Sequence, residues 1–527
     1  MTEFYDKYFM HQILTQPIKL FGKTKIRDKI DVLNSLKPYA DLDDIEYIYP
    51  LIFDKDIELS SAAARIAASI MRKVQGKCWN NVYDTVKYTK VEFEAIDNLL
   101  KFPSDISIHL LGIASLNSNG YIREKAIRNF SKVSSSSAIP YILLRLNDWV
   151  LPVRSLAEYT LKNILTIDNV EAFIDNSYLL NKLQNVLRAD SINTTELIID
   201  YLKDDSIKSK IKNSLRHPQV KARLFCYMLL RDSISYDEHI INSALKDKSF
   251  EIRIWLVEAI KKLDSEQKIA TASKLLNDKS AKVVTAVLRN FEDIVCLEFK
   301  DVLEKLVTDN RASVRDEARF IAKKHSLIRD FPEYYRKQLS ENPTPGTLVG
   351  LGETGCKSDF TLVSSFYTFE NAKIRLAAIT AMWYIAKDEA INYVLKELDS
   401  EIPKIKKTAR KIILGSRMPH VIYEMKTYLK SDKSDIKLFT LTAICRYGGW
   451  RALEAILYAV SFWKSPETDK AKSFLDNWLS KSASLYTRPE STTYSNITGL
   501  FELVKNKSLI SRELINELSF FFETRRL

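Results

Sequence analysis

The sequence predicts an all-α fold, a solenoid of about fourteen stacked helix pairs with a helical C-terminal cap. Three observations lead to this fold class. Turn-forming residues are scarce, since the 527 residues include only 12 glycines and 14 prolines, which disfavours β-rich folds with many tight turns. A short motif recurs about every 31 residues. Apolar residues within each motif follow the period of an α-helix.

The recurring motif is a β-branched residue followed by a basic one, as in Val153–Arg154, Ile252–Arg253 and Val314–Arg315. Equivalent basic residues are separated by one repeat, as Arg375 and Lys406 are, and longer intervals fit two repeats. A fixed spacing of this kind indicates a repeat architecture rather than several unrelated globular domains.

Each repeat is predicted to contain two helices. After the motif, apolar residues recur every three or four positions, as at Val314, Ala318 and Ile321, which marks one face of a helix. Prolines such as Pro152 and Pro403 stand where a first-turn proline is well tolerated. A second short apolar helix precedes the motif. Such a pair cannot bury its apolar face alone, so neighbouring repeats must stack.

A second regularity is an aspartate six positions before the basic residue. It produces three pairs: Asp148 with Arg154, Asp247 with Arg253, and Asp309 with Arg315. A turn aspartate can cap the following helix and can pair with arginines between repeats. Because a catalytic pair occurs once whereas this pair recurs, we interpret these residues as a structural ladder.

These residues resemble the HEAT-like repeat family, in its short variety named after phycobilisome lyases. The segments LNDWVLPVRSLAEYTLKNI and DNRASVRDEARFIAKK carry its pattern of a turn aspartate, a Val-Arg pair and an alanine three positions later. The resemblance covers most of residues 20–460. It implies a right-handed superhelix of the armadillo type with a concave binding surface, as in scaffolds and adaptors. It does not imply lyase activity.

The repeat pattern predicts the domain boundaries. We expect the solenoid over residues 1–463 and the C-terminal cap over residues 464–527, where the period is lost. Residues 157–220 and 325–350 depart from the pattern, and each is either a bend or drift in the repeat or a site-bearing insertion. The end of the cap is predicted to be one amphipathic helix that begins near Ser511.

The basic residues are concentrated in one segment. The chain carries 79 basic and 67 acidic residues, a net charge of +12, which permits an acidic or nucleic-acid partner without requiring one. Residues 401–450 hold 11 basic and 4 acidic residues, a net of +7. The candidate partner- or phosphate-binding residues are Lys404, Lys407, Arg410, Lys411, Lys437 and Trp383.

The resemblance implies that the second helix of each pair lines the concave face. The basic residues are therefore placed either in that groove or on an ordinary solvated face. HEAT-like DNA glycosylases also grip DNA with a basic groove, but the aromatic and carboxylate residues that they use there have no matching set in this sequence.

One segment looks like a nucleotide-binding loop. Residues 350–355, GLGETG, match the G-x-G-x-x-G fingerprint, but the surrounding pattern is helical. Gly355 and Gly448 are 93 positions apart, which is three repeats of 31. We therefore predict a turn between helix pairs, with these glycines in the left-handed conformation just past a helix end.

Other chemistry finds little support in the sequence. The five cysteines and six histidines are scattered, without C-x-x-C or H-E-x-x-H, so we predict no disulfide, metal, cofactor or catalytic residue. We find no signal peptide and no apolar run of about 20 residues, so membrane insertion is not expected and the cytoplasm is the predicted location.

The function predicted is that of a non-catalytic scaffold or adaptor for a protein partner. The alternative is a nucleic-acid-binding HEAT-like protein, with glycosylase-like chemistry as one form, that uses a basic groove around residues 404–437.

Overall fold

The computed structural model describes residues 2–16, 25–133, 135–185, 189–416, 421–482, 485 and 487–524. These residues form α-helices, short 3₁₀ helices and turns, with no β-strand among them. The chain divides into two compact units, unit 1 over Met1–Asn290 and unit 2 over Phe291–Leu527.

The α-helices of unit 1 are α1 (Thr2–Thr15), α2 (Ile26–Leu36), α3 (Ile45–Ile48), α4 (Ile57–Arg72), α5 (Trp79–Val86), α6 (Ser104–Ala114), α7 (Gly120–Phe130), α8 (Ile139–Arg145), α9 (Leu151–Ile164), α10 (Val170–Asp175), α11 (Ser177–Gln184), α12 (Ala189–Lys203), α13 (Lys208–Asn213), α14 (Val220–Leu229), α15 (Glu238–Lys246), α16 (Phe250–Ala259), α17 (Ser265–Leu276) and α18 (Ala281–Asn290).

The α-helices of unit 2 are α19 (Glu292–Glu298), α20 (Lys300–Val307), α21 (Ala312–Lys324), α22 (Phe331–Glu341), α23 (Pro345–Thr354), α24 (Phe360–Ser364), α25 (Ala372–Ile385), α26 (Lys387–Lys396), α27 (Pro403–Gly415), α28 (Val421–Met425), α29 (Ser434–Tyr447), α30 (Gly449–Phe462), α31 (Glu467–Ser482), α32 (Ser491–Asn506) and α33 (Arg512–Thr524). A 3₁₀ helix, η12 (Lys426–Lys430), follows α28.

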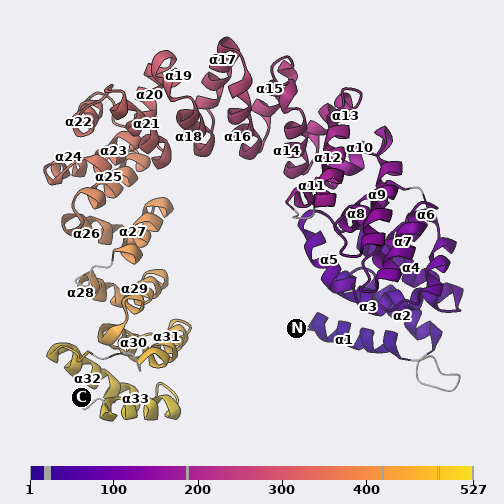
Figure 1. Cartoon of the computed structure of the whole chain (residues 1–527). Helices are drawn as coiled ribbons and strands as arrows, with labels where there is room; N and C mark the ends of the chain where they lie inside the picture. Colours follow the sequence, from indigo (N-terminus) through magenta and orange to yellow (C-terminus); the bar gives the residue numbers. More distant parts are fainter. Residues whose placement is uncertain are drawn as a thin grey trace. The chain divides into compact units, whose positions relative to one another are not determined.

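Successive helices stack in two layers. In unit 1, α14, α16 and α18 contact one another in turn, and α15 and α17 contact each other on the opposite side of the stack (Figure 1). In unit 2, α25, α27, α29 and α31 form one layer, whereas in the other layer α30 contacts both η12 and α32. Figure 1 shows α26 and α28 on the opposite side of the stack from α27 and α29. The predicted all-α solenoid is thus confirmed.

Local sequence sets where the helices begin. Asn119, Ser249 and Asn371 precede α7, α16 and α25, and each side chain accepts a hydrogen bond from the backbone N–H two residues later. Such caps satisfy N–H groups that have no partner within the helix. Pro152 and Pro403 occupy the first turns of α9 and α27, where a missing N–H has no consequence.

The predicted apolar faces form the core between the layers. Val314, Ala318 and Ile321 of α21 are all buried. Burial of such faces against the next repeat supplies the main favourable free energy of a solenoid, because no single helix pair encloses a core of its own.

Buried arginines join successive helix pairs. Arg123 donates from Nε and Nη2 to the Asp148 carboxylate at 2.9 and 2.8 Å, and both side chains are fully buried. Arg253 repeats this geometry with Asp278, where the Nη2–Oδ1 distance is 3.0 Å. The Nη1 of Arg253 also donates to the backbone carbonyl of Asp247, at 2.7 Å. One guanidinium therefore links the turns of two neighbouring repeats.

The carboxylates of Asp148 and Asp247 each bind an arginine of the preceding repeat. Asp148 and Arg154, predicted as a pair from one repeat, meet through the Asp148 carbonyl, which accepts from Arg154 Nη1 at 2.7 Å. The Asp247 carboxylate is bound by Arg223, with Nε–Oδ2 at 2.8 Å. Asp148 also accepts from the Val150 N–H at 2.9 Å. These contacts fix the turn and join it to the previous turn.

The pattern of pairs changes at the start of unit 2. Val284 stands where an arginine is expected, and Asp309 pairs instead with Arg311 of its own turn, at 2.7 Å. Arg315 donates to the Asp309 carbonyl at 2.7 Å, and its side chain pairs with Glu353 of α23. A carboxylate from a different helix thus takes the place of the usual turn aspartate.

The described part of residues 157–220 contacts a distant part of unit 1. Asn80 Nδ2 donates to the Tyr178 hydroxyl at 2.7 Å, across 98 positions. Gln219 Nε2 donates to Gln75 Oε1 at 2.9 Å, across 144 positions. Equivalent residues of adjacent repeats are about 31 positions apart, so these two contacts join parts of the chain that are several repeats apart. The segment therefore packs against α5 and the connection that precedes it.

Residues 325–350 lose the repeat spacing but keep a helix pair, α22 and the start of α23. The Thr344 side chain caps α23 and Pro345 occupies its first turn. The glycines of α23 allow close packing. A Cβ on Gly350 would lie 2.4 Å from the Tyr335 ring, and one on Gly352 would lie 2.6 Å from the Cα of Ala381.

The prediction of a turn at residues 350–355 is wrong, because most of this segment is helical. Gly350 and Gly352 lie within α23, and Gly355 ends the helix in an extended conformation, with φ −75°. Gly448 does take the predicted left-handed region at the end of α29, with φ 73°. The first two glycines are needed for helix packing, and no strand precedes them as a dinucleotide loop requires.

Residues 464–527, for which a cap is predicted, hold α31, α32 and α33 within the part of the chain that the structure describes. The predicted last helix is α33, and the Ser511 hydroxyl accepts the Leu514 N–H at 3.3 Å. Across all described residues, no helix combines the length and the apolar character that crossing a bilayer requires.

Candidate functional site

The candidate site is a groove between α27 and α29, and we call it the basic groove. Its volume is about 750 Å³. The residues that line it are Pro403, Lys406, Lys407, Arg410, Lys411, Leu414, Gly415, Phe439 and Arg446. Five of them are cations, and no carboxylate is among these lining residues.

The helical period of α27 places the cations. Ile405, Ala409 and Ile413 are buried against the neighbouring helices. Lys407 and Lys411 therefore project to solvent, and both are exposed. Ile412, next to this buried face, is only half-buried.

One wall of the basic groove is held by an ion pair. Arg410 Nη2 lies 2.8 Å from the Asp435 carboxylate, and Lys406 Nζ lies 3.6 Å from it. The Arg410 guanidinium also lies over the Phe439 ring at 4.9 Å. Burial raises the pKa of the Asp435 carboxyl, but the hydrogen bond and charge of Arg410 outweigh burial and hold that pKa below its usual value.

The other cations of the groove have no such partner. Lys407, Lys411 and Arg446 are exposed and make no ion pair with any described residue. Their charge is therefore available to an anionic ligand. Phe439 and Leu414 are half-buried and add apolar surface between the cations.

Three predicted residues lie outside the basic groove. Lys404 is exposed in the first turn of α27 and does not line it. Lys437 lies 4.0 Å from Glu467 and 5.6 Å from the Trp463 ring. Trp383 is half-buried on α25, with Lys387 6.0 Å from its ring.

Of the sequence-predicted candidates, Lys407, Arg410 and Lys411 line the groove. The other lining residues were not predicted, and they include the cations Lys406 and Arg446. A signal for Arg446 was present, because Gly415 and Arg446 are 31 positions apart and therefore occupy equivalent places in adjacent repeats. Equivalent places lie side by side in a stacked array. Both residues line the groove.

Acids from outside the basic segment reduce its net charge. Lys433 pairs with Asp399 at 2.6 Å, and Lys426 pairs with Glu454 at 2.5 Å. Both acids come from outside residues 401–450. Three exposed cations without an ion-pair partner among the described residues lie in the basic groove, and two others, Lys404 and Lys430, lie outside it.

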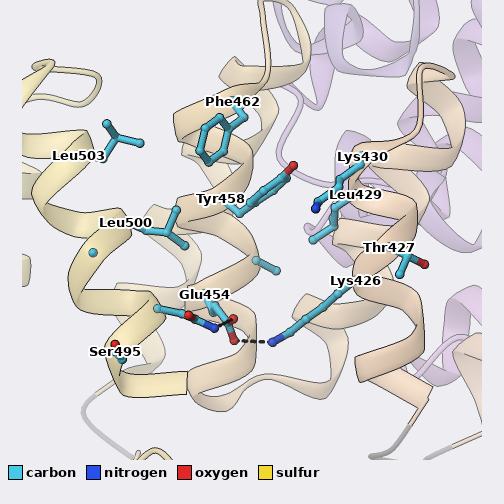
Figure 2. Close-up of a pocket in the computed structure, with 13 residues that line it drawn as sticks. Lys426, Thr427, Leu429, Lys430, Glu454, Tyr458, Phe462, Ser495, Leu500 and Leu503 are labelled. Atoms are coloured by element: carbon cyan, nitrogen blue, oxygen red, sulfur yellow. Dashed lines mark hydrogen bonds and ion pairs between the residues drawn. The ribbon is translucent and has the colours of Figure 1, made fainter. Parts of the chain in front are cut away.

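A second hollow lies in the other layer, among η12, α30 and α32, and we call it the α30 pocket (Figure 2). Its volume is about 650 Å³. Its lining residues are Lys426, Thr427, Leu429, Lys430, Glu454, Ala455, Tyr458, Phe462, Ser495, Asn496, Gly499, Leu500 and Leu503. Within the described residues, no group of three or more His, Cys, Asp or Glu is arranged to hold a metal ion.

No protein-family model and no curated protein matches this chain. Among solved structures, an engineered protein is 15% identical with a TM-score of 0.20, over 85% of this chain and 98% of its own. Kap121p bound to Ste12p is 13% identical with a TM-score of 0.34, over 97% of this chain and 65% of that one. The karyopherin Kap121p bound to the SUMO protease Ulp1p is 14% identical with a TM-score of 0.31, over 95% and 65%.

This chain thus spans about 65% of the length of Kap121p. Because all of these TM-scores are below 0.5, the similarities say nothing of what this chain binds.

Proposed function

We propose that this chain is a non-catalytic scaffold or adaptor whose basic groove binds an acidic segment of a protein partner. The observation that carries the proposal is the lining of the groove by five cations and no carboxylate. Cations gathered in a concave surface attract an anionic partner, raise its association rate and disfavour cationic competitors.

The apolar part of the groove specifies the partner further. Phe439 and Leu414 lie among the cations, so an acidic segment with one or two large apolar side chains fits better than a purely acidic one. Apolar anchors that enter a pocket commonly supply much of the binding free energy at protein interfaces, whereas exposed ion pairs supply little.

A nucleic-acid partner, including one for a glycosylase-like activity, is the alternative. Duplex DNA carries about one negative charge per 1.7 Å of its axis, so a duplex-binding surface needs cations along an extended path. Beyond the basic groove, Lys433 and Lys437 are already engaged with Asp399 and Glu467. A short acidic peptide matches this confined cluster better than a duplex does.

Three finer assignments belong to the same proposal. We infer that the repeats are of the short phycobilisome-lyase variety, since Arg123 and Asp148, like Arg253 and Asp278, pair across 25 positions. We also infer that residues 464–527 cap the solenoid and that the protein acts in the cytoplasm.

The test compares two anionic probes by fluorescence anisotropy. One is a labelled peptide of Glu and Asp residues around a central Phe-Leu pair, and the other is a labelled DNA duplex of the same total charge. We expect the peptide to bind more tightly, with an affinity that falls as salt rises because the cations are exposed. The double variant Lys407→Glu/Lys411→Glu is expected to bind the peptide about tenfold more weakly or worse.

The matched control is Lys373→Glu/Lys404→Glu, which changes the charge equally at two exposed lysines outside the groove. It should leave peptide binding within about twofold of the parent protein. Tighter binding of the duplex that is also lost in the groove variant would replace the peptide proposal with the nucleic-acid one. Equal losses in both variants would show that net charge alone governs binding.

A further inference from the structure

The α30 pocket differs from the basic groove in place and in chemistry. It opens in the layer formed by η12, α30 and α32, whereas the basic groove lies between α27 and α29 in the other layer. The two sites therefore do not share a wall. A ligand in the α30 pocket would not require the basic groove to be occupied.

The walls of the α30 pocket are mostly carbon. The ring centroids of Tyr458 and Phe462 on α30 lie 4.9 Å apart with the planes tilted by 41°, and Phe462 is 57% exposed. Figure 2 shows Leu500 directed from α32 towards α30, and Tyr458 directed towards Leu429 and Lys430 of η12. A large exposed aromatic ring beside leucines favours an apolar ligand, because contact would remove this surface from water.

The floor of the pocket is polar but internally neutralised. Glu454 is buried, and its carboxylate accepts from Lys426 Nζ at 2.5 Å and from Asn496 Nδ2 at 2.8 Å (Figure 2). A buried carboxylate requires such partners to remain charged. The Glu454 and Lys426 charges thus offset each other.

One uncompensated charge remains in the pocket lining, on Lys430. This side chain is exposed and has no ion-pair partner among the described residues. A ligand that fits both features has an apolar body against Tyr458, Phe462 and Leu500, and one negative charge near Lys430.

We propose that the α30 pocket binds an amphipathic small-molecule anion, a carboxylate with an acyl chain or ring system as its body. The volume of about 650 Å³ falls within the roughly 300–1,000 Å³ of pockets that hold small molecules. Apolar walls with a few converging polar groups are the usual composition of such sites. The ammonium of Lys430 pairs with the carboxylate, and the apolar body covers the exposed rings.

Gly499 provides a sharp test because it lines the pocket within α32, and a Cβ there would have nothing within 4 Å. Gly499→Phe places a ring in the pocket at an open helical position, so folding is not at risk. Gly499→Ala is its matched control. Lys430→Glu tests the charge, with Lys464→Glu, an exposed lysine outside the pocket, as its control.

The experiment is isothermal titration of the full chain with decanoate and, separately, with decyltrimethylammonium. We expect decanoate to bind and the cation to bind at least about fivefold more weakly. Each methylene removed from decanoate should weaken binding by up to about fourfold. Gly499→Phe should abolish binding while Gly499→Ala keeps it, and Lys430→Glu should weaken it about fivefold or more while Lys464→Glu does not.

Three outcomes overturn the proposal. They are an absence of decanoate binding, equal binding of the ammonium amphiphile, and binding that persists in Gly499→Phe. Circular dichroism of each variant, compared with the parent protein, shows that the fold is retained in every arm.

Discussion

Buried arginines of the stack, such as Arg123 and Arg253, and the cations of the basic groove carry the same charge but have different roles. Arg123 and Arg253 point into the stack and pair with carboxylates of the next repeat. Lys407 and Lys411 point out from α27, with no ion-pair partner among the described residues. The position of a cation within the repeat, rather than its charge, decides which role it takes.

The difference follows from burial. Buried polar groups are mostly hydrogen-bonded, and two neighbouring turns provide the acceptors for Arg123 and Arg253. An exposed lysine remains hydrated without a partner, so nothing in the fold requires a carboxylate beside it. We therefore interpret the buried arginines as structural and the exposed groove cations as available for binding.

The largest expected effect comes from breaking one buried pair. Arg253→Met keeps much of the side-chain volume but leaves the Asp278 carboxylate without its two guanidinium donors. Loss of one partner of a buried pair costs about 3–5 kcal/mol. The measurement is the free energy of unfolding from urea denaturation followed by circular dichroism.

Arg410→Met is the matched change in the basic groove, where Asp435 is exposed. Its effect on the free energy of unfolding should be about 1 kcal/mol or less. Similar effects for Arg253→Met and Arg410→Met would remove the distinction between the two regions.

The second prediction compares glycines. Gly352→Ala brings a Cβ against the backbone of Ala381, and overpacking of this kind destabilises by about 1–3 kcal/mol. Gly415→Ala, at the end of α27, meets nothing within 4 Å and should stabilise by up to about 1 kcal/mol. Thermal unfolding of the two variants checks the signs, and a stabilised Gly352→Ala would show that α23 and α25 do not need the glycine.

The smallest effect is expected in acid. The Arg336 hydrogen bond and charge hold the pKa of Asp359 below its usual value of about 3.9. A lowered pKa in the folded state gives stability that is present above the unfolded pKa and lost as pH falls through the folded one. Asp359→Asn should therefore lose less stability between pH 5 and pH 2 than the parent protein does.

Asp435→Asn should reduce the stability lost between pH 5 and pH 2 by less than Asp359→Asn does. The reason is that Asp435 is more exposed than Asp359. Unfolding midpoints measured across this pH range test the order. The reverse order would assign the stronger pair to the groove.

The sequence was sufficient to predict the solenoid because one basic residue, such as Arg253, identifies each regular repeat. The spacing of about 31 residues between these positions is kept in most repeats. The sequence pairs Asp247 with Arg253 of its own repeat, but the arginine that binds the Asp247 carboxylate is Arg223. It could not identify Glu353 as the partner of Arg315, because Ser340 stands 25 positions after Arg315 and the substitute carboxylate comes from α23. That partnership depends on how two helices approach each other.

Residues 350–355 and residues 401–450 also have contacts that could not be predicted from the sequence. Gly350 and Gly352 resemble turn residues in the sequence, and only the approach of the Tyr335 ring and of Ala381 explains their presence inside a helix. Counting charges over residues 401–450 likewise omits Asp399 and Glu454, which the fold brings to Lys433 and Lys426. In both segments the role of a residue depends on which side chains of neighbouring helices lie close to it.

The most direct test of the contrast between structural and available cations measures stability and binding on one variant, Lys407→Glu/Lys411→Glu. Urea denaturation gives its free energy of unfolding, and anisotropy gives its affinity for the acidic peptide with the central Phe-Leu pair. We predict a free energy of unfolding within about 0.5 kcal/mol of the parent protein, with peptide affinity reduced about tenfold or more. A loss of about 2 kcal/mol or more in stability, or unchanged peptide affinity, would contradict this account of the groove.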